Sequence, residues 1–124
     1  SWSRRYNAHL YSFQLLNKYP PELVQLFSNG DLHHALTSPD WLSTAIELEK
    51  VDLLVSVDTS VAHLAGALGV RTILLLSSPA DWRWGQTGTE TFLYSSMSLA
   101  RCDKPGNWST SLAEADRLVS LFLT

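Results

Sequence analysis

One stretch, residues 51–69, constrains the fold more than any other part of the sequence. It reads VDLLVSVDTSVAHLAGALG, an apolar run followed by three polar residues and then by small residues that end at a glycine. The run over 52–57 predicts a parallel strand that is covered on both faces. The segment 61–68, closed by Gly69, predicts a helix. A buried strand that passes directly into a helix is typical of a parallel α/β sheet.

The same alternation of strand and helix patterns continues along the rest of the chain. The residue patterns predict four further strands, over 9–16, 32–36, 71–76 and 92–101. They also predict three further helices, over 22–27, 41–49 and 109–123. A long loop with one helical turn is expected over 77–91. The predicted fold class is therefore α/β, with a Rossmann-like, mostly parallel sheet and helices on both faces, in three layers.

Apolar periodicity also predicts which side of each helix faces the core. For helix 109–123 the inward residues are expected to be Leu112, Ala115, Leu118, Val119 and Phe122. For helix 61–68 they are expected to be Val61, Leu64 and Leu68. The apolar stripe of helix 41–49, with Ser38 as its expected cap, consists of Trp41, Leu42, Ala45, Ile46 and Leu48.

Length, charge and cysteine content exclude several classes of protein. The 124 residues suit a single domain, 1–124, and the formal net charge of −3 offers no electrostatic footprint for nucleic acid. No apolar run approaches the ~20 residues of a transmembrane helix, and no signal-peptide pattern opens the chain. Cys102 is the single cysteine, so neither an internal disulfide nor a cysteine metal site can form. We expect a cytoplasmic protein that has no metal and no cofactor.

The polar residues after strand 52–57 are the first candidate site. Ligands of parallel α/β sheets bind at the carboxyl ends of the strands, which is where Asp58, Thr59 and Ser60 lie. The start of the following helix adds exposed N–H groups that suit a phosphate. Asp58 is expected either to bind a sugar hydroxyl or a neighbouring side chain, or to cap the helix, and one residue can do both. Thr59 and Ser60 have the same two alternatives.

His63 extends this candidate site along the helix. It follows Ser60 by three positions, and helical side chains lean toward the helix start, so its imidazole is expected to reach back toward the turn. There it would bond a ribose or phosphate oxygen, or else be a core histidine that is satisfied by a carbonyl. Gly66 costs the helix about 1 kcal/mol relative to Ala, which a close approach to the sheet or to a ligand would offset.

The segment Asp81-Trp82-Arg83-Trp84 follows the next strand and is expected at the same edge as Asp58. Asp81, Trp82 and Arg83 are candidate cleft residues, because exposed tryptophans can stack on a base, a sugar ring or a partner domain. The alternative is a loop that is anchored by buried indoles.

These residues resemble a known family. Residues 55–69 followed by 81–84 are similar to the carboxyl-terminal domain of bacterial glycosyltransferases of the ADP-heptose–lipopolysaccharide heptosyltransferase type, and most similar to versions linked to tetratricopeptide repeats. Residues 10–14 resemble the family's Tyr-Ser-Leu-Gln strand. Residues 40–45 resemble the helix before the long strand, and 106–108 its late Gly-Asp-Trp. The resemblance spans about residues 10–124.

The resemblance implies a GT-B architecture, in which the carboxyl-terminal domain binds the nucleotide-sugar donor. It places Asp58, Thr59, Ser60 and His63 at the sugar and diphosphate of the donor, with Gln14 nearby. The heptosyltransferases have glycine where this chain has Ser60, at a point where the backbone approaches the donor.

The function implied is the donor-binding part of a bacterial glycosyltransferase, with hexosyl or heptosyl transfer requiring an acceptor domain or repeat domain as partner. The alternative is a degenerate domain that acts as a structural or protein-interaction module. The resemblance covers neither the acceptor-binding domain nor the first strand–loop–helix unit of the donor domain. We therefore expect strands 9–14 and 52–57 to pair directly.

Overall fold

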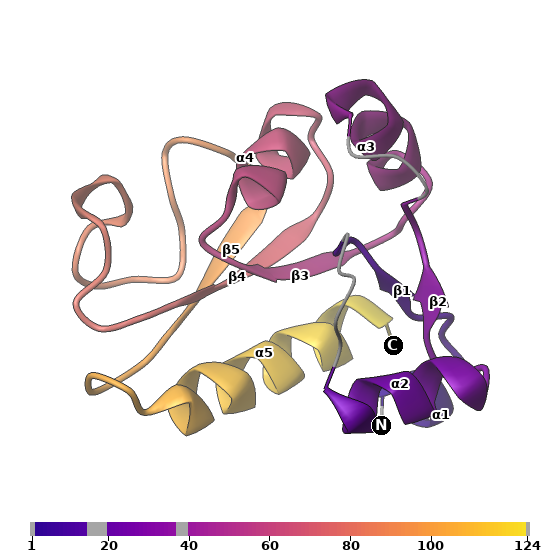
Figure 1. The fold of residues 1–124 in the computed structure, drawn as a ribbon. Coiled ribbons are helices and arrows are strands. Elements are labelled where there is room, and N and C mark those ends of the chain that lie inside the picture. Colours follow the sequence, from indigo (N-terminus) through magenta and orange to yellow (C-terminus); the bar gives the residue numbers. More distant parts are fainter. Residues whose placement is uncertain (1, 15–19, 37–39, 124) are drawn as a thin grey trace. The chain divides into compact units, whose positions relative to one another are not determined.

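Helices and parallel strands alternate in the computed structural model, which describes residues 2–14, 20–36 and 40–123 (Figure 1). Within these residues the structure is mixed α/β, with five α-helices and two small parallel sheets. The chain divides into two compact units, residues 1–47 and 48–124. In the described ranges, every helix is too short or too polar to cross a membrane.

The first unit contains short elements. They are α1 (Trp2–Tyr6), β1 (Tyr11–Ser12), α2 (Pro21–Ser28), β2 (His33–His34) and most of α3 (Trp41–Leu48). The strands β1 and β2 pair in parallel and form a sheet of their own. Both predicted strands are thus present but shorter than expected. The helix predicted over 22–27 is confirmed, and it begins after Pro20 because proline suits the first turn of a helix.

Two sequence-based expectations concern the strand pairing and the helix cap of this unit. The predicted direct pairing of 9–14 with 52–57 is wrong, because β1 and β2 form a two-stranded sheet and the strand within 52–57 belongs to a separate sheet. The expected cap Ser38 lies outside the described residues. Asp40 caps α3, because its Oδ1 accepts the backbone N–H of Ser43 at 2.7 Å.

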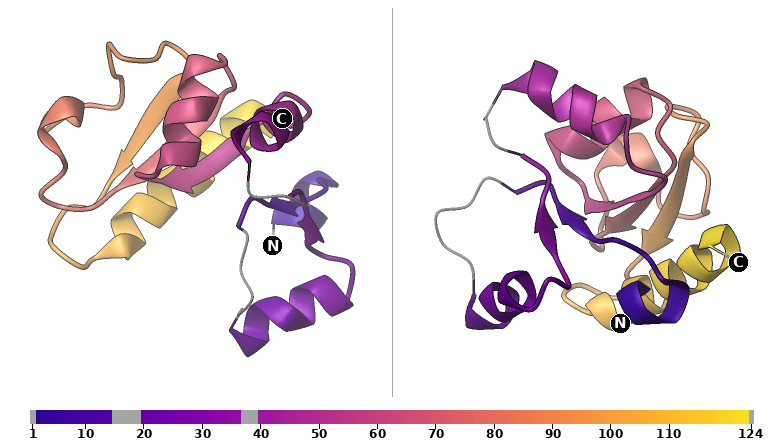
Figure 2. Two further views of the ribbon diagram at one scale, coloured as in Figure 1. Left: turned by 45° about the horizontal axis from the view of Figure 1, so that its top comes forward. Right: turned by 90° about the vertical axis from the view of Figure 1, so that its right-hand side faces the viewer.

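The second unit is built on a three-stranded parallel sheet with the order β3 (Leu54–Val57), β4 (Thr72–Leu76), β5 (Met97–Arg101). Its helices are α4 (Ser60–Ala67) and α5 (Trp108–Leu123), and the turn η1 (Trp82–Trp84) lies in the loop after β4. Figures 1 and 2 show α4 over one face of the sheet and α5 over the opposite face. The predicted strand 71–76, the loop turn and the helices 61–68 and 109–123 are confirmed, and the strand over 92–101 shortens to 97–101.

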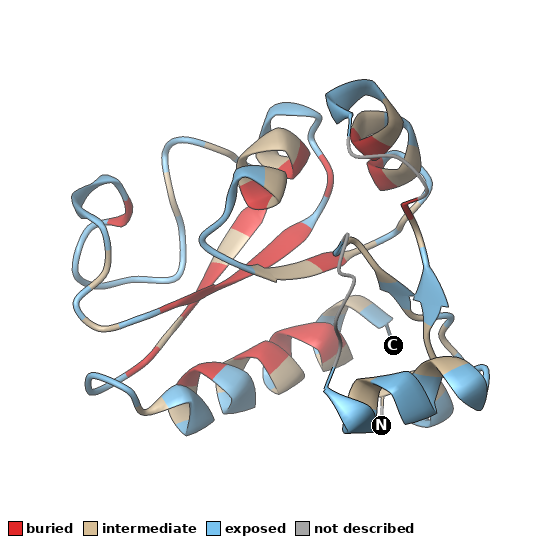
Figure 3. Ribbon diagram, in the orientation of Figure 1, coloured by how far each residue is buried: buried red, intermediate tan, exposed pale blue. Residues whose placement is uncertain are grey.

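The core of this unit lies on both sides of β4, whose five residues are all buried (Figure 3). The flanking strand β3 is buried only at Leu54, and Val57 is 46% exposed. The expectation that both faces of 52–57 are covered is therefore wrong toward the carboxyl end of the strand. In this sheet β3 is an edge strand, so it has a neighbouring strand on one side only.

The inward face of α4 also differs from the prediction. Ala62 and Ala65 are completely buried, whereas Leu68 is 37% exposed. Small side chains bring the helix backbone close to the sheet, and Ala62 packs in the cluster that contains Leu74, Leu76 and Leu99. Val61 and Leu64 are only partly buried, so the closest contact with the sheet is made by the alanines.

The inward face of α5 is largely as predicted, since Ala115, Leu118 and Val119 are buried. Leu112 is wrong, being 52% exposed. The neighbouring Ser111 is buried and donates a hydrogen bond from Oγ to the carbonyl of Ala100 at 2.7 Å. This bond turns Ser111 toward β5, and the next residue consequently points outward.

The apolar stripe expected on α3 is buried only toward the end of the helix. Leu48 is completely buried and Ala45 is partly buried, whereas Trp41, Leu42 and Ile46 are exposed. The helix is therefore amphipathic in sequence, but its large residues at the start are not covered by the described part of the chain.

Candidate functional site

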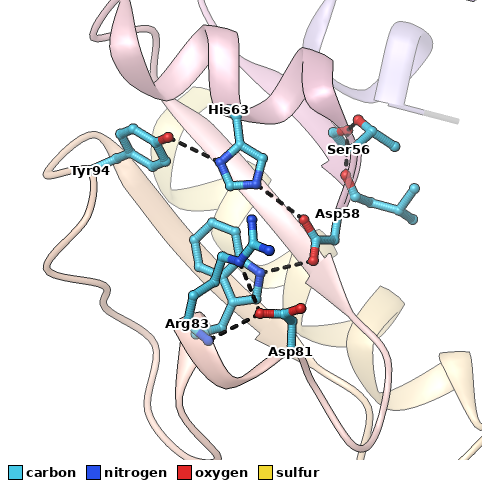
Figure 4. Close-up of polar contacts among 9 residues, drawn as sticks. Ser56, Asp58, His63, Asp81, Arg83 and Tyr94 are labelled. Carbon is cyan, nitrogen blue, oxygen red and sulfur yellow. Dashed lines mark hydrogen bonds and ion pairs between the residues drawn. The ribbon is translucent and has the colours of Figure 1, made fainter.

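Polar side chains gather where β3 and β4 end (Figure 4). Asp58 follows β3 directly, and Asp81 and Arg83 lie in the loop that follows β4. Parallel strands end at the same edge of a sheet, so the prediction that these segments share an edge is confirmed. His63 reaches the same place from the first turns of α4.

The Asp58 carboxylate is held by two aromatic side chains. Its Oδ2 accepts a hydrogen bond from the indole Nε1 of Trp84 at 2.9 Å. Its Oδ1 lies 3.4 Å from Nε2 of His63. The residue at the cap position of α4 is Thr59, which makes no side-chain capping bond. Of the two roles considered for Asp58, the structure therefore shows the bonding of neighbouring side chains.

His63 connects Asp58 to a tyrosine. Figure 4 shows its ring between the two, with Nδ1 at 3.0 Å from the Tyr94 hydroxyl. The ring also stacks on Trp84, with 5.3 Å between centroids and 29° between planes. In the tautomer with a hydrogen on Nε2, the Tyr94 hydroxyl donates to Nδ1, and Nε2–H faces the Asp58 carboxylate. The partners of the imidazole are thus side chains, and not the carbonyl that we considered as an alternative.

Gly66 makes room for Tyr94. A Cβ at this position would lie 2.5 Å from Cγ of the Tyr94 ring. The close approach that offsets the cost of a helical glycine is therefore made by an aromatic side chain. Tyr94 is not among the predicted site residues, because the sequence pattern predicts a strand over 92–101. The one signal in the sequence was the glycine three positions after His63, which puts a bare patch of helix beside the imidazole.

The two tryptophans of the loop have opposite environments. Trp84 is 3% exposed and packs in the core, which confirms that a buried indole anchors the loop. Trp82 is 82% exposed. Trp84 belongs to the site through Asp58, and sequence reasoning placed it only in the loop.

Asp81 and Arg83 form a local pair in the same loop. Oδ1 of Asp81 accepts hydrogen bonds from the backbone N–H of Arg83 at 3.2 Å and from its Nε at 2.9 Å. These bonds, with the backbone bond as the largest cause, hold the pKa of Asp81 below its usual value. Asp81 therefore caps η1 and fixes the direction in which Arg83 leaves the loop.

The start of α4 is exposed beside this cluster. Thr59 and Ser60 are both exposed, and the Thr59 hydroxyl lies 3.3 Å from the Oγ of Ser56. The N–H groups of the first turn therefore face outward without a bond from the cap side chain. Gln14, the remaining predicted site residue, belongs to the first unit, where its backbone N–H lies 3.3 Å from the Oγ of Ser12.

The arrangement can accept hydrogen bonds at a fixed carboxylate and can donate them from amides and hydroxyls. In the described ranges, no group of three or more His, Cys, Asp and Glu residues could hold a metal ion. A comparison of the chain with models of protein families, with curated proteins and with solved structures found no match. A functional interpretation therefore depends on this site and on the resemblance in the sequence.

Proposed function

We propose that this chain is the nucleotide-sugar donor-binding part of a bacterial glycosyltransferase. In this proposal the second unit belongs to a Rossmann-like, three-layer domain of the GT-B type, linked to tetratricopeptide repeats and located in the cytoplasm. Support comes from the resemblance of residues 55–69 and 81–84 to the heptosyltransferase type of enzyme. The parallel sheet with helices over both faces agrees with the proposal.

One observation carries this proposal: the uncapped, exposed start of α4 lies beside the fixed pair Asp58 and His63 at the carboxyl edge of a parallel sheet. The helix start offers N–H groups and a partial positive charge to the diphosphate. The hydroxyls of Thr59 and Ser60 lie at the same position. In this proposal the diphosphate meets hydrogen-bond donors at the helix start, and the sugar hydroxyl meets the adjacent carboxylate as acceptor.

Asp58 is the proposed acceptor for a sugar hydroxyl. Each carboxylate oxygen has two lone pairs, so Oδ2, which accepts one bond from Trp84, can accept a second from a ligand, and Oδ1 beside His63 can also accept one. The side chains of His63 and Asp58 are 27% and 35% exposed, which leaves both accessible from solvent. Glycosyl transfer also needs the acceptor to be positioned against the donor. We therefore propose that the chain binds donor but transfers sugar only together with an acceptor domain or repeat domain.

The test is an amide NMR titration of the purified chain with UDP-, GDP- and ADP-sugars. We expect saturable shifts in residues 58–64 for one nucleotide and a loss of those shifts in Asp58→Asn. Asp52→Asn is the matched control, because Asp52 is also exposed and precedes the opposite end of the same strand. Absence of saturable shifts at millimolar concentrations of all three ligands, with the chain folded, would contradict donor binding.

A second candidate is a degenerate domain that serves as a structural or protein-interaction module. The observation in its favour is that both ring nitrogens of His63 and both oxygens of Asp58 already contact side chains of the same unit. The double variant Asp58→Ala, His63→Ala separates the candidates. Loss of ligand shifts with unchanged stability supports a binding site, whereas loss of stability without any ligand shift in the parent chain supports a scaffold.

A further inference from the structure

The last residue of β5, Arg101, holds the loop that follows β4. Its Nε donates to the carbonyl of Gly88 at 2.8 Å, and one terminal nitrogen donates to the carbonyl of Gly85 at 2.9 Å. The other terminal nitrogen donates to the carbonyls of Thr87, at 3.2 Å, and Trp84, at 2.5 Å. Four carbonyls of one loop thus converge on a single guanidinium group.

Arginine suits this task better than lysine. A guanidinium presents five N–H donors in a planar fork, whereas an ammonium presents three donors from one point. Partial burial lowers the pKa of Arg101, yet arginine stays charged over the whole physiological range. A charged donor makes each bond to a neutral carbonyl stronger than a bond between neutral groups.

Further bonds keep this loop beside β5. The carbonyl of Thr89 accepts the backbone N–H of Leu99 at 2.8 Å, and Glu90 forms an antiparallel bridge with Ser98. Gly85 and Gly88 have positive φ angles of 69° and 96°, a conformation that other residues rarely adopt. The residues from 84 to 90 therefore run along β5, and Arg101 fixes the part nearest the candidate site.

Trp84 links this clamp to the candidate site. Its carbonyl is bound by Arg101, and its indole N–H is bound by Asp58. The same indole stacks on His63. A change in the path of the loop would therefore move the indole, and with it the hydrogen bond that orients the Asp58 carboxylate.

We propose that Arg101 is a positioning residue of the candidate site, which acts through the loop and Trp84 on the Asp58 carboxylate. Arg101 itself contacts the loop and not the carboxylate. Only the part of the proposal that concerns ligand binding rests on the proposed function. The part that concerns Trp84 can be measured without a ligand.

The experiment measures solvent exchange of the indole proton of Trp84 by NMR, with its signal assigned from Trp84→Phe. Arg101→Lys keeps the charge and removes the fork, so we expect at least tenfold faster exchange of this proton. We expect the amides of residues 72–76 to exchange at the parent rate. Arg117→Lys is the matched control, because Arg117 pairs with Glu114 on the exposed side of α5, and it should leave the indole rate unchanged.

Gly88→Ala gives an independent test that leaves Arg101 in place. A Cβ at Gly88 meets open space, but its φ of 96° disfavours alanine, so the carbonyl held by Arg101 should shift. We expect faster indole exchange here too. Unchanged indole exchange in both variants would overturn the proposal, as would equal acceleration at Trp84 and in residues 72–76, because the effect would then be general destabilisation.

A titration of Arg101→Lys with the nucleotide sugar that shifts the parent chain tests the ligand part. We expect weaker binding by at least threefold, with the same residues shifted at saturation. Unchanged affinity in a variant with accelerated indole exchange would overturn the ligand part alone. If no nucleotide sugar binds the parent chain, the proposed function fails while the indole measurement still decides the role of Arg101.

Discussion

Both units of the chain contain apolar residues, but the second unit buries far more of them than the first. In the second unit every residue of β4 is buried, between two neighbouring strands and beneath helices on both faces. In the described residues of the first unit, 2–14, 20–36 and 40–47, only Leu36 and Thr44 are buried. The first unit does not lack apolar residues, since Val24, Leu26 and Trp41 are all present and exposed. The difference teaches that burial depends on strands long enough to form a sheet that helices can cover.

The largest expected effect tests this contrast directly. Leu74→Ala, at a completely buried position of β4, should lower the free energy of unfolding of residues 48–124 by about 3 kcal/mol. Leu26→Ala, at a partly exposed position of α2, removes the same atoms and should cost less than about 1 kcal/mol. Urea denaturation followed by residue-resolved NMR measures both. An equal loss in the two variants would show that the contrast in burial has no energetic meaning.

The next prediction concerns Gly66, where α4 has no side chain. Gly66→Ala should destabilise the second unit by about 2 kcal/mol, because the new methyl group would overlap the Tyr94 ring. The substitution should also change the NMR signals of the His63 ring, since Tyr94 bonds its Nδ1. Thermal denaturation measures the stability.

A double variant separates the overlap from the helix propensity. In a Tyr94→Ala background the ring is absent, so Gly66→Ala should stabilise the helix by up to about 1 kcal/mol. A loss of stability in that background would mean that Gly66 is required for a reason other than contact with Tyr94.

A smaller effect is expected at the bond between Trp84 and Asp58. Trp84→Phe removes the indole N–H and leaves one carboxylate oxygen without this donor, which should cost about 1 kcal/mol beyond the loss of ring volume. The matching variant Asp58→Ala, which removes the acceptor, and the double variant together isolate the interaction energy of the pair. If the two single effects add fully, the 2.9 Å contact makes no energetic contribution.

The smallest expected effect on stability is the pH dependence that Cys102 contributes. Burial is the main cause that raises the pKa of this thiol, while the hydrogen bond with Ser111 lowers it. A raised pKa in the folded chain means that the unfolded chain ionises first as pH rises. The contribution to stability is therefore complete at neutral pH and is lost as pH passes upward through the thiol range.

Urea denaturation across the thiol range of pH measures that loss of stability, and thiol labelling tests the burial that causes it. With an aromatic disulfide reagent at neutral pH, we expect Cys102 to react at least about tenfold more slowly in the folded chain than in urea. The rate should rise in Leu74→Ala, because opening of the core exposes the thiol, and should stay unchanged in Leu26→Ala. Equal rates in folded and unfolded chain would contradict the burial of Cys102.

Elements with a strong local pattern were predictable from the sequence. The proline that starts α2, the continuous apolar run of β4 and the glycine that ends α4 each act within a few residues, and all three elements are present. The pairing of β1 was not predictable, because strand partners are chosen by contacts between distant segments. The inward face of α4 was predicted wrongly for a related reason, since hydrophobicity favours large residues while close packing favours small ones.

In the candidate site, too, local features were predictable from the sequence and contacts between distant residues were not. The sequence by itself determined that Asp58, Thr59, Ser60 and His63 lie where a strand passes into a helix, because backbone preferences and apolar periodicity act over a single turn or strand. Only the tertiary structure decided that Tyr94 and Trp84 are the partners of His63 and Asp58. Those residues come from loops 31 and 26 positions further along the chain. A loop has no periodicity to reveal its path, and the contact depends on the packing of the whole sheet edge.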